Sequence, residues 1–133
     1  MLRIIGGVVA GLVGWIVVVT VLNFGLRLWL PGYVEAEPTL VFTLGMKIAR
    51  LAIAVLSSIA AGAIVRVIAP ASRWAPWIVG VVLLAMFLPE HVMIWQKFPA
   101  WYHLTFLVTL APLVVLGARL GARLETQPAV KPA

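Results

Sequence analysis

The sequence predicts an all-α integral membrane protein, a four-helix bundle whose spans run up, down, up and down. Of its 133 residues, 64% are hydrophobic and only 11% are charged, whereas soluble domains average about 25% charged residues. Four long segments are also poor in charge, and each reaches the length of about 20 residues that crosses about 30 Å of hydrocarbon. This composition excludes an ordinary soluble enzyme, because so few charges could not cover a water-exposed surface.

The first predicted span covers residues 4–30 and ends at the Pro31-Gly32 pair, a strong turn signal. Residues 4–26 contain no charge. The apolar region of a secretory signal peptide is only about 7–15 residues long and is followed by a cleavage site of small residues. We therefore expect this segment to be a retained membrane span.

The second span is predicted over residues 39–68, with Thr39 as its N-cap and Pro70 just beyond its end. The loop before it, between residues 33 and 38, is short and acidic. The third span is predicted over residues 76–95, with Pro76 in the first turn, where a missing N–H costs nothing.

The fourth span is predicted over residues 101–124. Pro89 and Pro112 interrupt the third and fourth spans and should bend them, because each removes a backbone hydrogen bond. Residues 125–133 contain two prolines and no apolar period, so we expect a flexible cytoplasmic tail after a single transmembrane domain over residues 1–124.

Positive charge predicts the orientation of these spans. Lysines and arginines near the span ends divide six to two between the two sides, or six to four if Lys47 and Arg50 are counted. Cytoplasmic loops carry the excess of positive charge, so both termini are predicted to be cytoplasmic, in the cytoplasmic (inner) membrane. The six residues on that side are Arg3, Arg66, Arg73, Arg119, Arg123 and Lys131, and the opposite side has Arg27 and Lys97.

Small residues predict where the helices meet, because close backbone approach drives helix association in lipid. The first span carries a stripe of small and β-branched residues, the second contains Ser58-x-x-x-Gly62, and the fourth contains Gly117-x-x-x-Gly121. Packing within one chain and a homodimer seam both fit these patterns. The stripe on the first span consists of Gly7, Gly11, Gly14, Val18, Val21 and Gly25.

A polar cluster is the most informative feature of the sequence. Polar and small residues share one face of the second span, including Lys47 and Arg50. If the second and third spans fold back on each other, Arg50 and Glu90 come within about one helical turn in depth. A lone charge in hydrocarbon costs at least about 2.5–3.5 kcal/mol, so we predict an Arg50–Glu90 ion pair, with Lys47 as the alternative partner. The pair could fix helix register or form a functional polar site.

Two histidines complete the candidate polar site of Lys47, Arg50, Glu90, His91 and His103. His91 and His103 are symmetric about residue 97 and should therefore lie at similar depth on neighbouring spans. They could hold haem or a metal ion, or lie at the interface and bond to backbone, water or headgroups. The chain has no cysteine, which excludes disulfides and thiolate metal sites, and no cofactor is predicted.

Three functions remain open. The first is a non-catalytic accessory or structural membrane component, within a homodimer or a larger membrane complex. The second is a small homo-oligomeric transporter or ion pathway that uses an outer-leaflet Arg50/Glu90 site. The third is a haem- or metal-binding membrane protein that uses His91 and His103. The lipid bilayer is the predicted partner in each case, and a nucleic-acid partner is not expected, because the basic residues form no stripe interleaved with aromatics.

Overall fold

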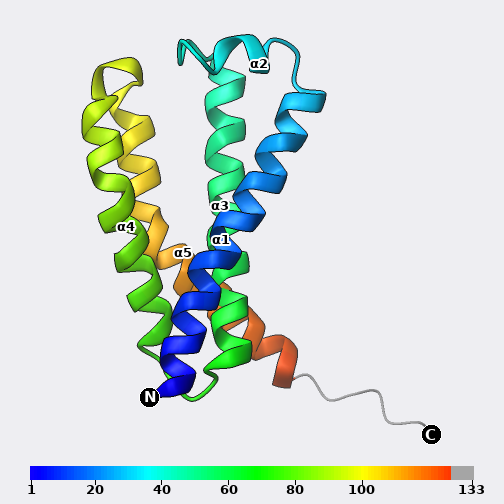
Figure 1. The fold of residues 1–133 in the computed structure, drawn as a ribbon, viewed down its shortest axis with the longest axis vertical. Helices are drawn as coiled ribbons and strands as arrows, with labels where there is room; N and C mark the ends of the chain where they lie inside the picture. Colours follow the sequence, from blue (N-terminus) through cyan, green and yellow to red (C-terminus); the bar gives the residue numbers. More distant parts are fainter. Residues whose placement is uncertain (127–133) are drawn as a thin grey trace, which may run out of the picture.

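The computed structural model describes residues 1–126, which are mostly helical (Figure 1). Four helices are long and apolar enough to cross a membrane, and they indicate a multi-pass membrane protein. These four are α1 (Leu2–Trp29), α3 (Leu44–Ile68), α4 (Ala75–Met93) and α5 (Ala100–Thr126). Two short elements join them, namely α2 (Tyr33–Ala36) and the 3-10 helix η1 (Trp95–Lys97).

The start of α3 differs from the prediction. Thr43, and not Thr39, is the N-cap, and its hydroxyl accepts a hydrogen bond of 3.2 Å from the Met46 N–H. Leu40 adopts a positive φ of 57°, which a helix cannot contain. The irregular segment also lets Phe42 stack between two other aromatic rings, so tertiary packing places the N-cap four residues later than predicted.

Two other boundaries also differ from the prediction. The α4 helix ends at Met93, and the chain tightens into η1 before Phe98 becomes extended. At the other end of the sequence, Glu125 and Thr126 continue α5, so the predicted tail begins too early. The rest of that predicted tail, residues 127–133, lies outside the described residues.

The two ends of the molecule contain different elements. The end with α2 and η1, called here the upper end, lies opposite the end with the N-terminus and the 69–74 connector, called the lower end (Figure 1). The α3 helix packs mainly against α5 and α1, and α4 packs mainly against α5. The α1 and α4 helices lie close together at the lower end and diverge toward the upper end (Figure 1).

Small residues bring the helices together in the lower half. A Cβ atom on Gly62 of α3 would lie only 1.8 Å from the Val114 carbonyl oxygen of α5. A Cβ on Gly117 would lie 2.0 Å from the Ile59 oxygen, and one on Gly11 would lie 2.5 Å from a Val65 methyl group. Gly11, Gly62 and Gly117 therefore serve packing within the chain, whereas a Cβ on Gly25, in the same stripe as Gly11, would meet no atom within 4 Å, which leaves the homodimer seam a prediction.

The six tryptophans form two groups, one buried residue and five exposed residues near the helix ends. Trp15 is 3% exposed and donates a 3.0 Å hydrogen bond from Nε1 to the Ser58 hydroxyl. The other five indoles are at least 41% exposed, and they occur near the helix ends, where aromatic side chains mark membrane–water interfaces. These five are Trp29, Trp74, Trp77, Trp95 and Trp101.

Candidate functional site: a polar cavity at the upper end

The upper end is built around Tyr33, which α2 places in the interior. Gly32 precedes α2 with a φ of 79°, a left-handed conformation that glycine adopts without strain. This turn directs Tyr33 inward, where its side chain is fully buried and stacks on Phe42 with ring centroids 5.5 Å apart. Phe98 extends the stack on the other side of Phe42. The result is an aromatic platform beneath the loops.

Arg50 reaches this platform from the second turn of α3. Its Nη1 donates to the Tyr33 hydroxyl at 2.8 Å, and its Nε donates to the Tyr102 hydroxyl at 3.2 Å. The guanidinium carbon also lies 4.8 Å from the centre of the Phe42 ring, within the range of a cation–π contact. Two phenols and an aromatic face therefore fix this cation, and no carboxylate of the described residues forms an ion pair with it.

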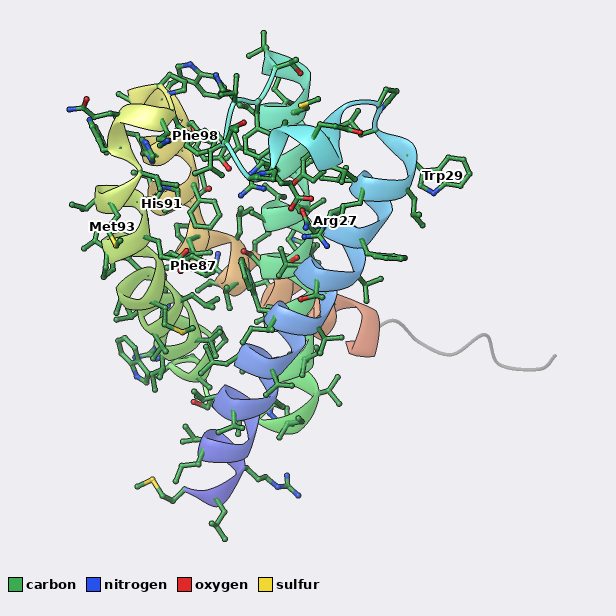
Figure 2. All side chains as sticks on the ribbon, turned by 45° about the horizontal axis from the view of Figure 1, so that its top comes forward. Arg27, Trp29, Phe87, His91, Met93 and Phe98 are labelled. Atoms are coloured by element: carbon green, nitrogen blue, oxygen red, sulfur yellow. The ribbon has the colours of Figure 1, made fainter. Side chains whose placement is uncertain are left out.

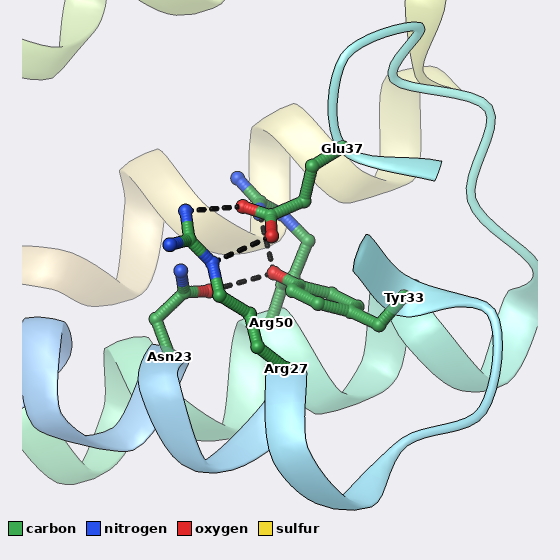
Figure 3. A network of polar contacts seen from close by, with 5 residues as sticks. All are labelled: Asn23, Arg27, Tyr33, Glu37 and Arg50. Carbon is green, nitrogen blue, oxygen red and sulfur yellow. Dashed lines mark hydrogen bonds and ion pairs between the residues drawn. The ribbon is translucent and has the colours of Figure 1, made fainter. Parts of the chain in front are cut away.

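Tyr33 connects α1 to this network (Figure 3). Its hydroxyl donates to the Asn23 side-chain oxygen at 2.7 Å while it accepts from Arg50. Burial raises the pKa of the Tyr33 phenol above its ordinary value, and the nearby Arg50 opposes part of this shift. The phenol therefore stays protonated and keeps its role as a donor to Asn23.

An ion pair closes the outer edge of the network. Arg27 of α1 donates from two nitrogens to the Glu37 carboxylate, at 2.7 and 3.0 Å, in the two-pronged geometry typical of arginine (Figure 3). The Arg27 side chain is about half exposed. This pair ties the segment after α2 to the upper end of α1.

The predicted ion pair between Arg50 and Glu90 is not formed. Two of the Arg50 nitrogens are occupied by the phenols, and Glu90 is exposed on α4 without an ion pair to any described residue. Lys47 is half-buried on α3 and does not pair with Glu90 either. Arg50 and Glu90 nevertheless line the same cavity, so the structure brings them to one site without direct contact.

The histidines do meet. Their Nδ1 atoms lie 2.7 Å apart, and His103 Nε2 lies 3.1 Å from the Trp95 carbonyl oxygen. A carbonyl can only accept, so His103 Nε2 carries the proton, and in a neutral ring His103 Nδ1 must then accept from His91 Nδ1. The lone pair left on His91 is at Nε2. Because His91 lines the same cavity, this acceptor belongs to the polar site.

This geometry uses both nitrogens of His103 in hydrogen bonds. Among the side chains that the structure describes, no group of three or more His, Asp or Glu residues is arranged to hold a metal ion. The haem or metal hypothesis for His91 and His103 stays a prediction. An absorption spectrum of the purified protein, with a Soret band as the readout, would test it.

The cavity itself has a volume of about 530 Å³ and is open to the outside. Its wall contains residues of α1, α3, α4 and α5, and its exposed rim includes Thr20 and Phe24 of α1 and Glu90 of α4. It therefore opens between the two helices that diverge in Figure 1. In Figure 2, Trp29 projects away from the bundle on the outer side of α1, whereas Phe87 of α4 belongs to the cavity wall.

Polarity is distributed along the cavity in one direction. On α1 the lining changes from Trp15 and Val19 to Asn23 and Arg27 toward the upper end, and α4 changes likewise from Phe87 to Glu90 and His91. At about 1.5 Å per residue, Trp15 and Arg27 are about 18 Å apart along the helix. The cavity thus has an apolar lower part and a polar upper part, the same division that an amphipathic molecule has.

The comparisons with known proteins found no matching family model, no curated relative and no similar solved structure. The site itself therefore provides the evidence for function. Sequence reasoning missed its phenols and amide, although Tyr33 and Tyr102 both lie within three residues of a predicted span end. The spacing of Tyr33 and Tyr102 from Arg50 along the chain gave no signal, because the contacts are long-range.

Proposed function

We propose that this protein is a non-catalytic accessory component of the cytoplasmic (inner) membrane that holds an amphipathic molecule with a zwitterionic head group. In this proposal the bundle runs up, down, up and down, and both termini are cytoplasmic. The upper cavity then lies in the outer leaflet. The excess of Lys and Arg at the lower end supports that orientation.

One observation carries the proposal: Arg50 and Glu90 line one cavity without pairing. Each is a charge near hydrocarbon without an ionic partner in the part of the chain that the structure describes, a costly state for a membrane protein. A head group with an anionic and a cationic part would neutralise both. The Arg50 guanidinium still has donors that no described residue uses, and the Glu90 carboxylate and His91 Nε2 can accept from an ammonium group.

The shape of the cavity supports a ligand that enters from the bilayer. Its opening lies between α1 and α4. Its lower wall is formed by the aromatic side chains of Trp15, Phe87 and Phe106 and by aliphatic side chains such as Val19. An acyl chain that followed this wall would lie in hydrocarbon while its head group reached Arg50. Apolar surface with a few placed polar groups is the usual composition of a ligand site.

The test is lipid retention by the full chain, measured by native mass spectrometry in mild detergent. The part of the retention that Arg50→Gln removes should be larger for phosphatidylethanolamine than for phosphatidylcholine, whose quaternary ammonium has no N–H, and than for phosphatidylglycerol, which has no cation. Arg50→Gln and Glu90→Gln should each lower retention about tenfold, the effect of one charge-assisted hydrogen bond. Matched controls are Lys97→Gln and Glu35→Gln, exposed charges at the same end that do not line the cavity.

Equal losses of the three lipids in Arg50→Gln, or unchanged phosphatidylethanolamine retention in Glu90→Gln, contradict the proposal. The same spectra also test the accessory role, because a bound partner or a second copy of the chain increases the measured mass of the complex. An isolated monomer with no partner in membranes solubilised under mild conditions would count against an accessory component.

A second candidate is a small homo-oligomeric transporter or ion pathway. The observation that favours it is that Arg50 and Glu90 share a cavity that is open to the outside. In liposomes, a transporter would accelerate the movement of a fluorescent zwitterionic lipid between leaflets, and Glu90→Gln would abolish this activity. A binding component would retain the lipid without moving it.

A further inference from the structure

A second cavity, of about 360 Å³, lies at the lower end of the bundle. It is formed by the end of α3, the connector before α4, the first turn of α4 and the last turns of α5. Three of its lining side chains are arginines, and none is an aspartate or glutamate. This site is separate from the upper cavity, since the two share no lining residue.

The three arginines are held differently. Arg66 donates to the Pro70 carbonyl oxygen, which fixes it against the connector. Arg73 lies over the Trp74 ring, with 5.4 Å between the guanidinium carbon and the ring centre. Arg119 is exposed on α5, and the described residues offer it no ion pair. Arg73 and Arg119 thus present positive charge to the cavity mouth, and no carboxylate among the described side chains neutralises it.

The cavity also has an apolar side that runs along α5. Val115, Ala118 and Ala122 line it, and their spacing of three and four residues places them on one helix face. The exposed indoles of Trp74 and Trp77 stand at its edge, at the level where aromatic side chains meet lipid head groups. A cationic rim above an apolar groove is complementary to a phosphate attached to an acyl chain.

We propose that this lower cavity binds an anionic phospholipid, with the phosphate between Arg73 and Arg119 and an acyl chain along the Val115–Ala118–Ala122 face of α5. Basic cavities between membrane helices at the cytoplasmic side are typical sites for anionic head groups. Free phosphate carries the same charge, but it would leave the apolar face uncovered. The lipid is therefore the ligand that satisfies both parts of the site.

The experiment compares retention of phosphatidylglycerol and phosphatidylcholine by the full chain in native mass spectrometry. The double variant Arg73→Gln/Arg119→Gln should lose phosphatidylglycerol about tenfold or more. The control Arg3→Gln/Lys97→Gln removes two exposed charges that line neither cavity and should retain it. Equal losses in both double variants would show a nonspecific charge effect and overturn the proposal.

Two further arms keep the result decisive. Ala122→Leu fills the groove and leaves every arginine in place, so it should also lower retention; no change overturns the acyl-chain assignment. This variant also replaces the arginine variant if the latter unfolds. Millimolar inorganic phosphate should not displace the lipid, and displacement by phosphate would assign the site to the free anion.

Discussion

The same four helices pack differently at the two ends of the bundle. In the lower half, glycines let the backbones of α3 and α5 touch, and α1 lies against α3 through Gly7 and Gly11. In the upper half, α1 and α4 diverge, and aromatic rings, a buried tyrosine and an arginine occupy the space. The difference indicates that the lower half holds the fold together, whereas the upper half preserves an opening that tighter packing would close.

Among the substitutions considered, Gly62→Ala should lower the free energy of unfolding the most. The added Cβ would lie 1.8 Å from the Val114 oxygen and 2.7 Å from the Ala118 nitrogen. Both are backbone atoms, so the helices themselves must move apart. Overpacking of this kind costs about 1–3 kcal/mol, occasionally more, and we expect a value at the upper end. Unfolding of the purified protein in mixed micelles measures it.

Gly25→Ala is the matched control for that variant. A Cβ at Gly25 meets no atom within 4 Å, and replacing glycine inside a helix gains about 0.5–1 kcal/mol. The two substitutions are chemically identical and should have opposite signs. If Gly25→Ala destabilised the protein as much as Gly62→Ala, the contrast between the two halves would be wrong, and the homodimer seam would become the better interpretation of Gly25.

At the upper end, Tyr102→Phe should lower the free energy of unfolding. This change keeps the ring that stacks on Phe98 and removes the hydroxyl that accepts from Arg50 Nε. Hydrogen bonds to charged groups contribute about 1.5–3 kcal/mol, and we expect the lower end of that range because Arg50 is only half-buried. A double-mutant cycle with Arg50→Met isolates the bond. An equal cost of Tyr102→Phe in both backgrounds would mean that the bond contributes nothing.

Much of the fold could be predicted because its signals are local. Long apolar runs, turn prolines and the spacing of glycines identify four helices and their packing faces from neighbouring residues alone. Thr39 was predicted as an N-cap because it precedes the apolar run, and Thr43 replaced it because Phe42 packs against residues far along the chain.

The site was less predictable, because its partners are distant in sequence. Glu90 was predicted as the partner of Arg50 because its charge is opposite. The actual partners, the phenols of Tyr33 and Tyr102, are 17 and 52 residues from Arg50 along the chain. A neutral hydroxyl carries no sequence signature that distinguishes a partner of arginine from an interfacial tyrosine. Depth predicts the proximity of His91 and His103, but the tautomers follow only from the Trp95 carbonyl.

A smaller effect is expected from Trp15→Phe, at the boundary between the halves. Phenylalanine can keep the contact with Phe87, whose ring centre is 4.9 Å away, but it loses the 3.0 Å hydrogen bond to Ser58. Ser58 still donates to the Ala54 carbonyl. Hydrogen bonds between membrane helices average about 0.6 kcal/mol, so a loss of that order is expected. A loss several times larger would place Trp15 within the tightly packed half.

The smallest expected effect concerns the Arg27–Glu37 pair. Although its geometry is two-pronged, the Arg27 side chain is about half exposed, and exposed ion pairs contribute little and are screened by salt. Arg27→Gln should therefore leave the unfolding transition nearly unchanged. It should instead loosen the segment after α2, which faster amide exchange at residues 33–37 would reveal, while exchange in α3 stays the same. High salt should produce the same local change in the unmodified protein. If Arg27→Gln instead lowered global stability as much as Tyr102→Phe, the polar network would extend as one cooperative unit to the outer edge of the bundle, and the upper half would be more rigid than its open cavity indicates.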